Sequence, residues 1–448
     1  MKIPARIKKG FDLDEAIMMA TFCNQIYDLY RYDDGSIDDS ELEEIYNSIH
    51  HNQDWKFAHS IRHDRKAVRG FILRNHLREQ YAVVFRGTIL TDRGAFELTN
   101  AVSDLDWDLI NYGSMADPTV KVVKGFYEGF DSVADQVKLF FKTILGQLTP
   151  KDFKEIESLE TERQFACVKA LADAGKIKLG SEFKEKVTTL IQKALEDEEI
   201  GNDDELKPIF EFLETSLLPL KSVPDKVDVY VTGHSLGGSL SKFCAIALRR
   251  WFGTETNSGL NIKAYPIGAP KIGNKAFANY FNRQMGEGTV YRIENTLDLM
   301  MRFPVPPPFP LSLFAGDNGL RIGNLFLGNF ADVGELHTIT GLGSQSISLG
   351  TGGALDLGLG IPYPHSFEAF LQLLKEEKAF WDQISQSVNL VLAPLLKSLL
   401  QEQLEEIIEF RNKDLKQDLA SLLANNGFAS YKKTETAVDE PIPFETSV

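Results

Sequence analysis

The spacing of apolar residues predicts alternating helices and strands along most of the chain. Apolar positions recur at helical spacing in residues 11–30, and an acidic, irregular stretch follows over 31–65. Two short apolar runs, 68–73 and 81–85, are separated by a polar turn and are typical of strands. An aromatic-rich stretch then predicts a helix over about 126–145.

Residues 146–222 have a different composition from their surroundings. They are rich in Lys and Glu, keep a helical periodicity and are interrupted at glycines. This pattern predicts a helical insertion whose charged faces are solvated rather than a binding site.

The next segment predicts the centre of the fold. Residues 227–232 are rich in β-forming side chains and run directly into Gly233, and small and apolar residues follow at helical spacing over 236–251. Further strands are predicted at 262–267 and 290–293. Strands that alternate with helices indicate the α/β class, with a mostly parallel central sheet flanked by helices.

The C-terminal part departs from this alternation. Residues 303–362 are rich in Pro, Gly, Leu and Phe, a helix is predicted over 366–374, and 389–410 form a strongly amphipathic helix. The predicted organisation, in chain order, is an N-terminal helical segment packed on the core (1–64), a main domain with the insertion (65–380), amphipathic helices (385–430) and a disordered tail (431–448).

Composition is that of an ordinary globular protein, with 43% apolar and 25% charged residues among 448. The net charge of −16 argues against nucleic acid or an anionic membrane as partner, because both favour a basic surface. The 3 cysteines show neither metal-ligand spacing nor a disulfide framework.

The ends of the chain bear on location. The first residues lead into charged positions without an apolar stretch, and no run approaches the ~18 apolar residues that span a bilayer. We therefore expect a cytoplasmic protein without a transmembrane segment. The oligomeric state does not follow from the sequence.

The sequence Gly-His-Ser-Leu-Gly at 233–237 points to nucleophilic catalysis by Ser235. Such a pentapeptide alone is a weak signal, expected by chance in roughly one comparable sequence in ten. Here it lies between a predicted strand and a predicted helix, the context that a nucleophile elbow requires. Gly233 and Gly237 supply the small residues that a tight turn needs. His234 is interpreted as a packing residue.

A serine nucleophile needs a general base, and the base needs a carboxylate that orients it. Of the two histidines after Ser235, His365 lies in a loop before a helix and suits the base, whereas His337 lies in a strand-like run and suits a structural role. Asp298, just past a predicted strand, faces the same sheet edge as the elbow. The remaining candidates for the acid are Asp317, Asp332 and Glu294.

Further short motifs follow one another along the chain, at 83–88, 104–107, 124–126, 233–237, 265–274 and 295–304. Together they resemble the class 3 lipase family, the fungal triacylglycerol lipase-like α/β-hydrolases, over about residues 65–375. This chain has Val123 where members commonly carry histidine, and Met300-Met301 where they often carry Val-Pro.

The resemblance implies an α/β-hydrolase fold and a serine hydrolase that works without metal or cofactor. It implies Ser235, Asp298 and His365 as the catalytic triad. It also implies that the oxyanion is bound by Thr88 and by the backbone N–H of Leu236.

The implied substrate is a neutral lipid or another carboxylic ester, met at a lipid–water interface. Two segments are candidates for a lid, 89–103 and the insertion 146–222. The apolar stretches 304–313 and 318–361 either line an acyl pocket or pack as a core loop, and helix 389–410 either docks on the fold or touches a membrane. Alternative functions are a phospholipase or galactolipase, and a catalytically silent lipid-binding protein.

Overall fold

A computed structural model of the chain describes residues 7–30, 39–49, 54–87, 106–113, 117–196, 206–220, 226–253, 259–296, 298, 330–339 and 367–387. The chain divides into two compact units, 1–380 and 381–448. The fold described below belongs to the first unit. The finer division of that unit into domains stays a prediction.

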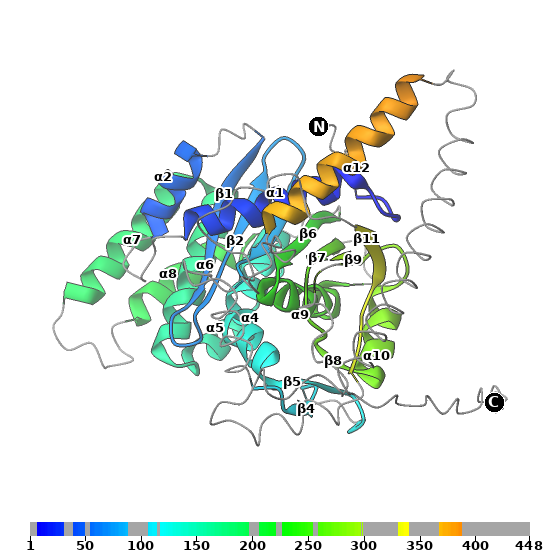
Figure 1. Cartoon of the computed structure of the whole chain (residues 1–448). Helices are drawn as coiled ribbons and strands as arrows, with labels where there is room; N and C mark the ends of the chain where they lie inside the picture. Colours follow the sequence, from blue (N-terminus) through cyan, green and yellow to red (C-terminus); the bar gives the residue numbers. More distant parts are fainter. Residues whose placement is uncertain are drawn as a thin grey trace, which may run out of the picture. The chain divides into compact units, whose positions relative to one another are not determined.

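A seven-stranded mixed sheet forms the centre of the first unit (Figure 1). The first two pairings of the sheet are antiparallel and the other four are parallel, so the predicted mostly parallel α/β sheet is confirmed. In spatial order the strands are β1 (Trp55–His63), β2 (Val68–Asn75), β3 (Gln80–Phe85), β6 (Val227–His234), β7 (Leu260–Ile267), β9 (Tyr291–Asn295) and β11 (Glu335–Ile339).

Helices cover both faces of this sheet, because alternate strand residues point to opposite sides. Val83 and Phe85 of β3 belong to one buried cluster, whereas Ala82 and Val84 belong to the other. The first cluster is closed by α4 (Lys124–Leu145), α9 (Leu236–Phe252) and α10 (Lys275–Met285). The second is closed by α1 (Leu13–Leu29), α2 (Asp39–Ile49) and α12 (Phe367–Ser387) (Figure 1).

A small second sheet completes the α/β unit. Its four strands pair in the order β10-β8-β5-β4, and all its pairings are antiparallel. The strands are β4 (Leu109–Asn111), β5 (Lys121–Val123), β8 (Gly273–Asn274) and β10 (Phe330–Ala331).

The described residues of the predicted insertion form four helices, which share a separate hydrophobic cluster with Leu139 of α4. A buried hydrogen bond joins this layer to the sheet, since His59 Nδ1 on β1 lies 2.8 Å from Asp173 Oδ2 on α6. The helices are α5 (Pro150–Glu157), α6 (Thr161–Leu179), α7 (Ser181–Glu196) and α8 (Lys207–Leu217).

A buried polar network fastens α1 to the sheet. Glu15 is 2% exposed, and its carboxylate accepts hydrogen bonds from Tyr230 Oη (2.8 Å), Tyr265 Oη (2.6 Å) and Lys263 Nζ (2.5 Å). All three donors come from β6 or β7. The network therefore fixes the helix against the two central parallel strands.

The expectation that 31–65 is irregular is wrong for its described part. That stretch contains α2 and β1. The alternation in β1 is hard to recognise because His59 and His63 occupy inward positions, and His59 is tolerated there only through its bond to Asp173.

The helix predicted over 366–374 extends to Ser387. The helix predicted at 389–410 and the tail after 431 lie outside the described residues, as does most of 303–362.

Candidate active site

The elbow at Ser235 has the strained backbone that the motif predicts. Ser235 lies between β6 and α9 with φ 57° and ψ −124°, a left-handed region that residues other than glycine rarely adopt. Its backbone N–H donates to the carbonyl of Ile267 at 3.0 Å, and the residue is 4% exposed. Such strain persists where the surrounding structure enforces it, often at catalytic positions.

The flanking glycines are required by close backbone approaches. A Cβ at Gly233 would lie 2.3 Å from the carbonyl oxygen of Gly237. A Cβ at Gly237 would lie 2.2 Å from the carbonyl oxygen of Phe85, at the end of β3. Any larger residue at either position would push α9 away from the sheet.

The end of β3 runs past Ser235. A Cβ placed on Gly87 would be 3.2 Å from Ser235 Cβ and 2.5 Å from the carbonyl oxygen of His234. The next residue, Thr88, lies outside the described residues. Leu236 is the first residue of α9, where backbone N–H groups are free of intrahelical partners. The oxyanion roles of Thr88 and Leu236 remain predictions.

Asp298 is buried in the turn after β9. It is 1% exposed, and its backbone N–H donates to the carbonyl of Asn295 at 2.9 Å. A Cβ on Gly268 would lie 3.4 Å from Asp298 Oδ2, and the preceding residue, Ile267, accepts the N–H of Ser235. Ser235 and Asp298 thus both border the turn at residues 267–270. His365 lies outside the described residues, so the triad remains a prediction.

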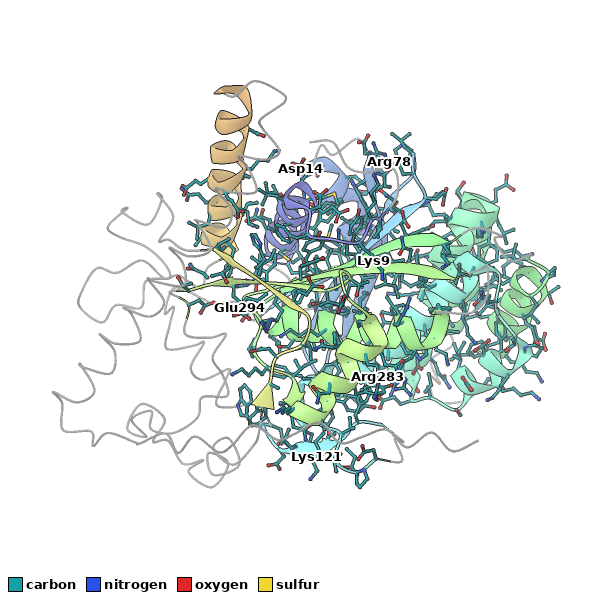
Figure 2. The ribbon with its side chains drawn as sticks, turned by 90° about the vertical axis from the view of Figure 1, so that its right-hand side faces the viewer. Lys9, Asp14, Arg78, Lys121, Arg283 and Glu294 are labelled. Carbon is teal, nitrogen blue, oxygen red and sulfur yellow. The ribbon has the colours of Figure 1, made fainter. Side chains whose placement is uncertain are left out.

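Two of the other carboxylates have cationic partners. Glu294, labelled in Figure 2, and Asp332 lie 3.4 and 3.3 Å from guanidinium nitrogens of Arg292. Burial raises the pKa of Glu294, although Arg292 opposes the rise. Asp317 lies outside the described residues. Arg292 thus engages both of these carboxylates, and the choice of Asp298 as the acid stays a prediction.

His337 has structural contacts. Its ring stacks on Phe11 with centroids 3.8 Å apart, and its Nε2 lies 3.1 Å from Glu377 Oε2 on α12. This placement at the edge strand β11 supports the structural role expected for His337 and leaves His365 as the candidate base.

Tyr27 was not identified from the sequence, yet it borders the elbow. Its hydroxyl lies 3.0 Å from His234 Nδ1, and the His234 ring also packs edge-on against Phe370 of α12. The same hydroxyl would be 2.3 Å from a Cβ on Gly87. The helical spacing placed Tyr27 on α1, but nothing in that pattern reveals which strand end its hydroxyl reaches.

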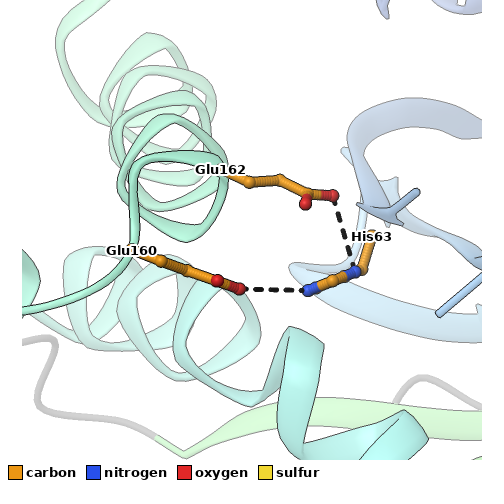
Figure 3. A group of neighbouring side chains, drawn as sticks. All are labelled: His63, Glu160 and Glu162. Carbon is orange, nitrogen blue, oxygen red and sulfur yellow. Dashed lines mark ion pairs between the residues drawn. The ribbon is translucent and has the colours of Figure 1, made fainter. Parts of the chain in front are cut away.

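One group in the described part of the chain has metal-ligand spacing: His63, Glu160 and Glu162 (Figure 3). The backbone N–H of Lys66 donates to His63 Nδ1 at 3.3 Å, so neutral His63 carries its proton on Nε2 and offers no lone pair there. Arg65 lies 3.5 and 3.6 Å from the two carboxylates. We interpret the group as a polar cluster in which Arg65 pairs with both carboxylates and which joins the β1–β2 turn to the start of α6.

The cysteines are buried thiols rather than nucleophiles. Cys23, Cys167 and Cys244 are free, and burial raises the pKa of each, that of Cys23 to about 12. Within the described part of the chain, no helix combines the length and apolar composition of a membrane crossing.

The chain is similar to known lipases over part of its length. Residues 163–307 match the family model described as lipase (class 3), which confirms the resemblance over that segment. A secreted mono- and diacylglycerol lipase 1 of Fusarium solani is 36% identical over 74 residues, 16% of this chain. The Malassezia globosa secreted mono- and diacylglycerol lipase MDL3 is 33% identical over 109 residues (24%), and a Rhizomucor miehei lipase 37% over 95 residues (21%). The aligned stretches cover 20%, 31% and 24% of those proteins.

The expected cytoplasmic location is contradicted by these relatives, because two of them are named as secreted lipases. The expectation rested on the lack of an apolar stretch near residue 1 and of a run long enough to span a bilayer, and neither observation decides the location of a protein.

Proposed function

We propose, from the class 3 lipase match of residues 163–307, that this protein is a serine hydrolase that cleaves carboxylic esters of lipids. The observation that carries the proposal is the elbow itself. Ser235 has a strained left-handed backbone at the end of a central parallel strand. The buried residue Asp298 borders the 267–270 turn, whose Ile267 carbonyl accepts the backbone N–H of Ser235. A structural serine would need neither the strain nor the two glycines that permit it.

The proposed reaction proceeds through an acyl-enzyme. His365 takes the proton of the Ser235 hydroxyl as the serine attacks the ester carbonyl, and Asp298 orients the imidazole. The tetrahedral oxyanion is bound by backbone N–H groups of Thr88 and Leu236. The alcohol leaves with the proton from His365, and water then releases the fatty acid by the reverse sequence of proton transfers.

The proposed substrates are acylglycerols. Two relatives are named mono- and diacylglycerol lipases, which supports glycerol esters over phospholipids. The net charge of −16 also disfavours anionic phospholipid surfaces. A phospholipase or galactolipase is therefore the second candidate.

Of the two lid candidates, the contacts of the described residues disfavour the insertion, and 89–103 lies outside the described residues. Moving the insertion would break contacts that hold it in place. The buried pair His59–Asp173 ties it to β1, Lys142 of α4 pairs with the buried carboxylate of Asp152, and Arg163 pairs with Asp135 of α4 at 2.5 Å. We therefore propose that the insertion is not the lid.

The direct test is Ser235→Ala assayed on p-nitrophenyl esters, with Ser132→Ala on α4 as a control. The wild type and the control should hydrolyse the esters and be labelled by a fluorophosphonate, whereas Ser235→Ala should do neither. Unchanged turnover in Ser235→Ala would refute the proposal. A folded wild type that neither turns over nor labels would indicate a lipid-binding protein.

Substrate class is tested with an acyl chain-length series above and below the solubility limit. A rate increase at the interface would mark a lipase, and its absence an esterase. Comparing diacylglycerol with phosphatidylcholine and galactolipid vesicles separates the remaining candidates. Preference for either polar lipid would overturn the acylglycerol assignment.

A further inference from the structure

The turn at residues 267–270, after β7, contacts both proposed catalytic residues. The carbonyl of Ile267 accepts the backbone N–H of Ser235 at 3.0 Å. A Cβ on Gly268 would lie 3.4 Å from Asp298 Oδ2, and the backbone N–H of Gly268 donates to Ile293 of β9 at 2.9 Å. Any shift of this turn would therefore move the nucleophile and the acid relative to each other.

A lysine of α9, the helix that follows Ser235, donates hydrogen bonds to this turn. Lys242 is fully buried and lies about two helical turns after Ser235. Its Nζ donates to the carbonyl of Pro270 at 2.8 Å and to that of Ala269 at 3.3 Å. Ser239, on the same helix, donates its hydroxyl to Pro270 at 3.2 Å.

The buried environment of Lys242 is unfavourable for a charged ammonium group. Burial lowers the pKa of Lys242 to about 8, and the charges of Asp332 and Glu294 oppose this effect while those of Arg292 and Lys271 add to it. An apolar side chain of similar length would avoid the desolvation, but it would leave two buried carbonyls without these donors. The hydrogen bonds of Lys242 to the turn are therefore the feature that distinguishes it from a packing residue.

We propose that Lys242 is a positioning residue that holds the 267–270 turn and thereby sets the placement of Ser235 against Asp298. The proposal rests on the proposed serine hydrolase function. Lys242 does not touch the reacting atoms. It acts through main-chain carbonyls of a turn that borders both partners.

The test compares Lys242→Met and Lys242→Gln with Lys142→Met. Lys142 is a matched control because it lies on α4 and pairs with Asp152 of the insertion, away from the turn. We expect Lys242→Met to lower kcat on a p-nitrophenyl ester about 10- to 100-fold with KM within twofold, since misplacement by about 1 Å costs on this order. The fluorophosphonate labelling rate should fall in parallel. Lys242→Gln retains a neutral donor and should be intermediate, and Lys142→Met should keep wild-type kcat.

Amide hydrogen exchange gives a readout that does not depend on activity. In Lys242→Met the amides of Ser235 and Gly268, which bond to Ile267 and Ile293, should exchange faster than in the wild type. They should be unchanged in Lys142→Met. If wild-type protein shows no esterase activity, the proposed function fails while this exchange pattern still tests the role of Lys242.

Three results would overturn the proposal. One is a folded Lys242→Met protein with kcat within twofold of wild type. Another is an equal loss in Lys142→Met, which would indicate general destabilisation. The third is unchanged exchange of both amides. If Lys242→Met does not fold, Lys242→Gln decides by the same three measurements.

Discussion

The buried pair between Glu15 and Lys263 makes a quantitative prediction about how α1 is held. Replacing Lys263 with Met removes the one cation of the network and leaves the Glu15 carboxylate in a site where it is 2% exposed. Tyr230 and Tyr265 still donate to it. The variant thus separates the contribution of charge from that of hydrogen bonding.

The expected loss in the free energy of unfolding is about 3–5 kcal/mol, the range found when one partner of a buried ion pair is removed. Coulomb attraction gives a similar size, about 4 kcal/mol for unit charges about 4 Å apart at an effective permittivity of about 20. The two tyrosine hydroxyls remain as donors to the carboxylate, so we expect the lower part of the range.

The assay is urea unfolding of Lys263→Met, Glu15→Gln and the double variant, followed by tryptophan fluorescence. Glu15→Gln should also be costly, because it leaves the Lys263 ammonium buried beside a neutral amide. The double variant should lose less than the sum of the single losses, since neither charge is then left alone. A loss below about 1 kcal/mol in Lys263→Met, or additive losses in the double variant, would refute the reasoning.

Three further predictions concern the site and its surroundings. Gly237→Ala should abolish esterase activity and destabilise the fold by about 1–3 kcal/mol or more, because the new Cβ would clash with the carbonyl oxygen of Phe85. A variant that is stable in a thermal melt and active in the ester assay would contradict this. Tyr27→Phe should cost about 1 kcal/mol in urea unfolding through loss of the bond to His234, with a several-fold drop in kcat; unchanged values in both assays would contradict it. The pKa of Lys242 in the folded state, about 8, lies below its ordinary 10.5, so between these pH values the folded state binds fewer protons than the unfolded state. Wild-type stability should therefore rise with pH across this window, by up to about 3 kcal/mol relative to Lys242→Met, and parallel stability curves for the two proteins would exclude this effect.

The elements that could be predicted from sequence are those whose burial is periodic. Strand β6 and helix α9 can be predicted from their apolar patterns, and the glycines around Ser235 predict the turn between them. Strand β1 was missed because His59 occupies an inward position that only Asp173, far along the chain, makes acceptable. Local patterns carry no information about a partner so distant in sequence.

The same distinction applies within the site. The candidate nucleophile Ser235 could be proposed from the sequence because a strained turn restricts the residues next to it. Tyr27 and Lys242 could not, because each reaches the site through one polar atom at the end of a side chain on a helix. Both look like ordinary helix positions until the fold shows which carbonyl or ring nitrogen they meet.

The long insertion between α4 and β6 does not disturb the backbone geometry around Ser235. Strand β3 pairs in parallel with β6 from Gln80–Asp228 to Phe85–Gly233, so the register that brings Phe85 against Gly237 is set by the sheet. The insertion adds a cluster of its own and joins the sheet at β1, two strands away from β3. Its contacts therefore bear on stability at the sheet edge, whereas the geometry at Ser235 depends on β3, α1 and the 267–270 turn.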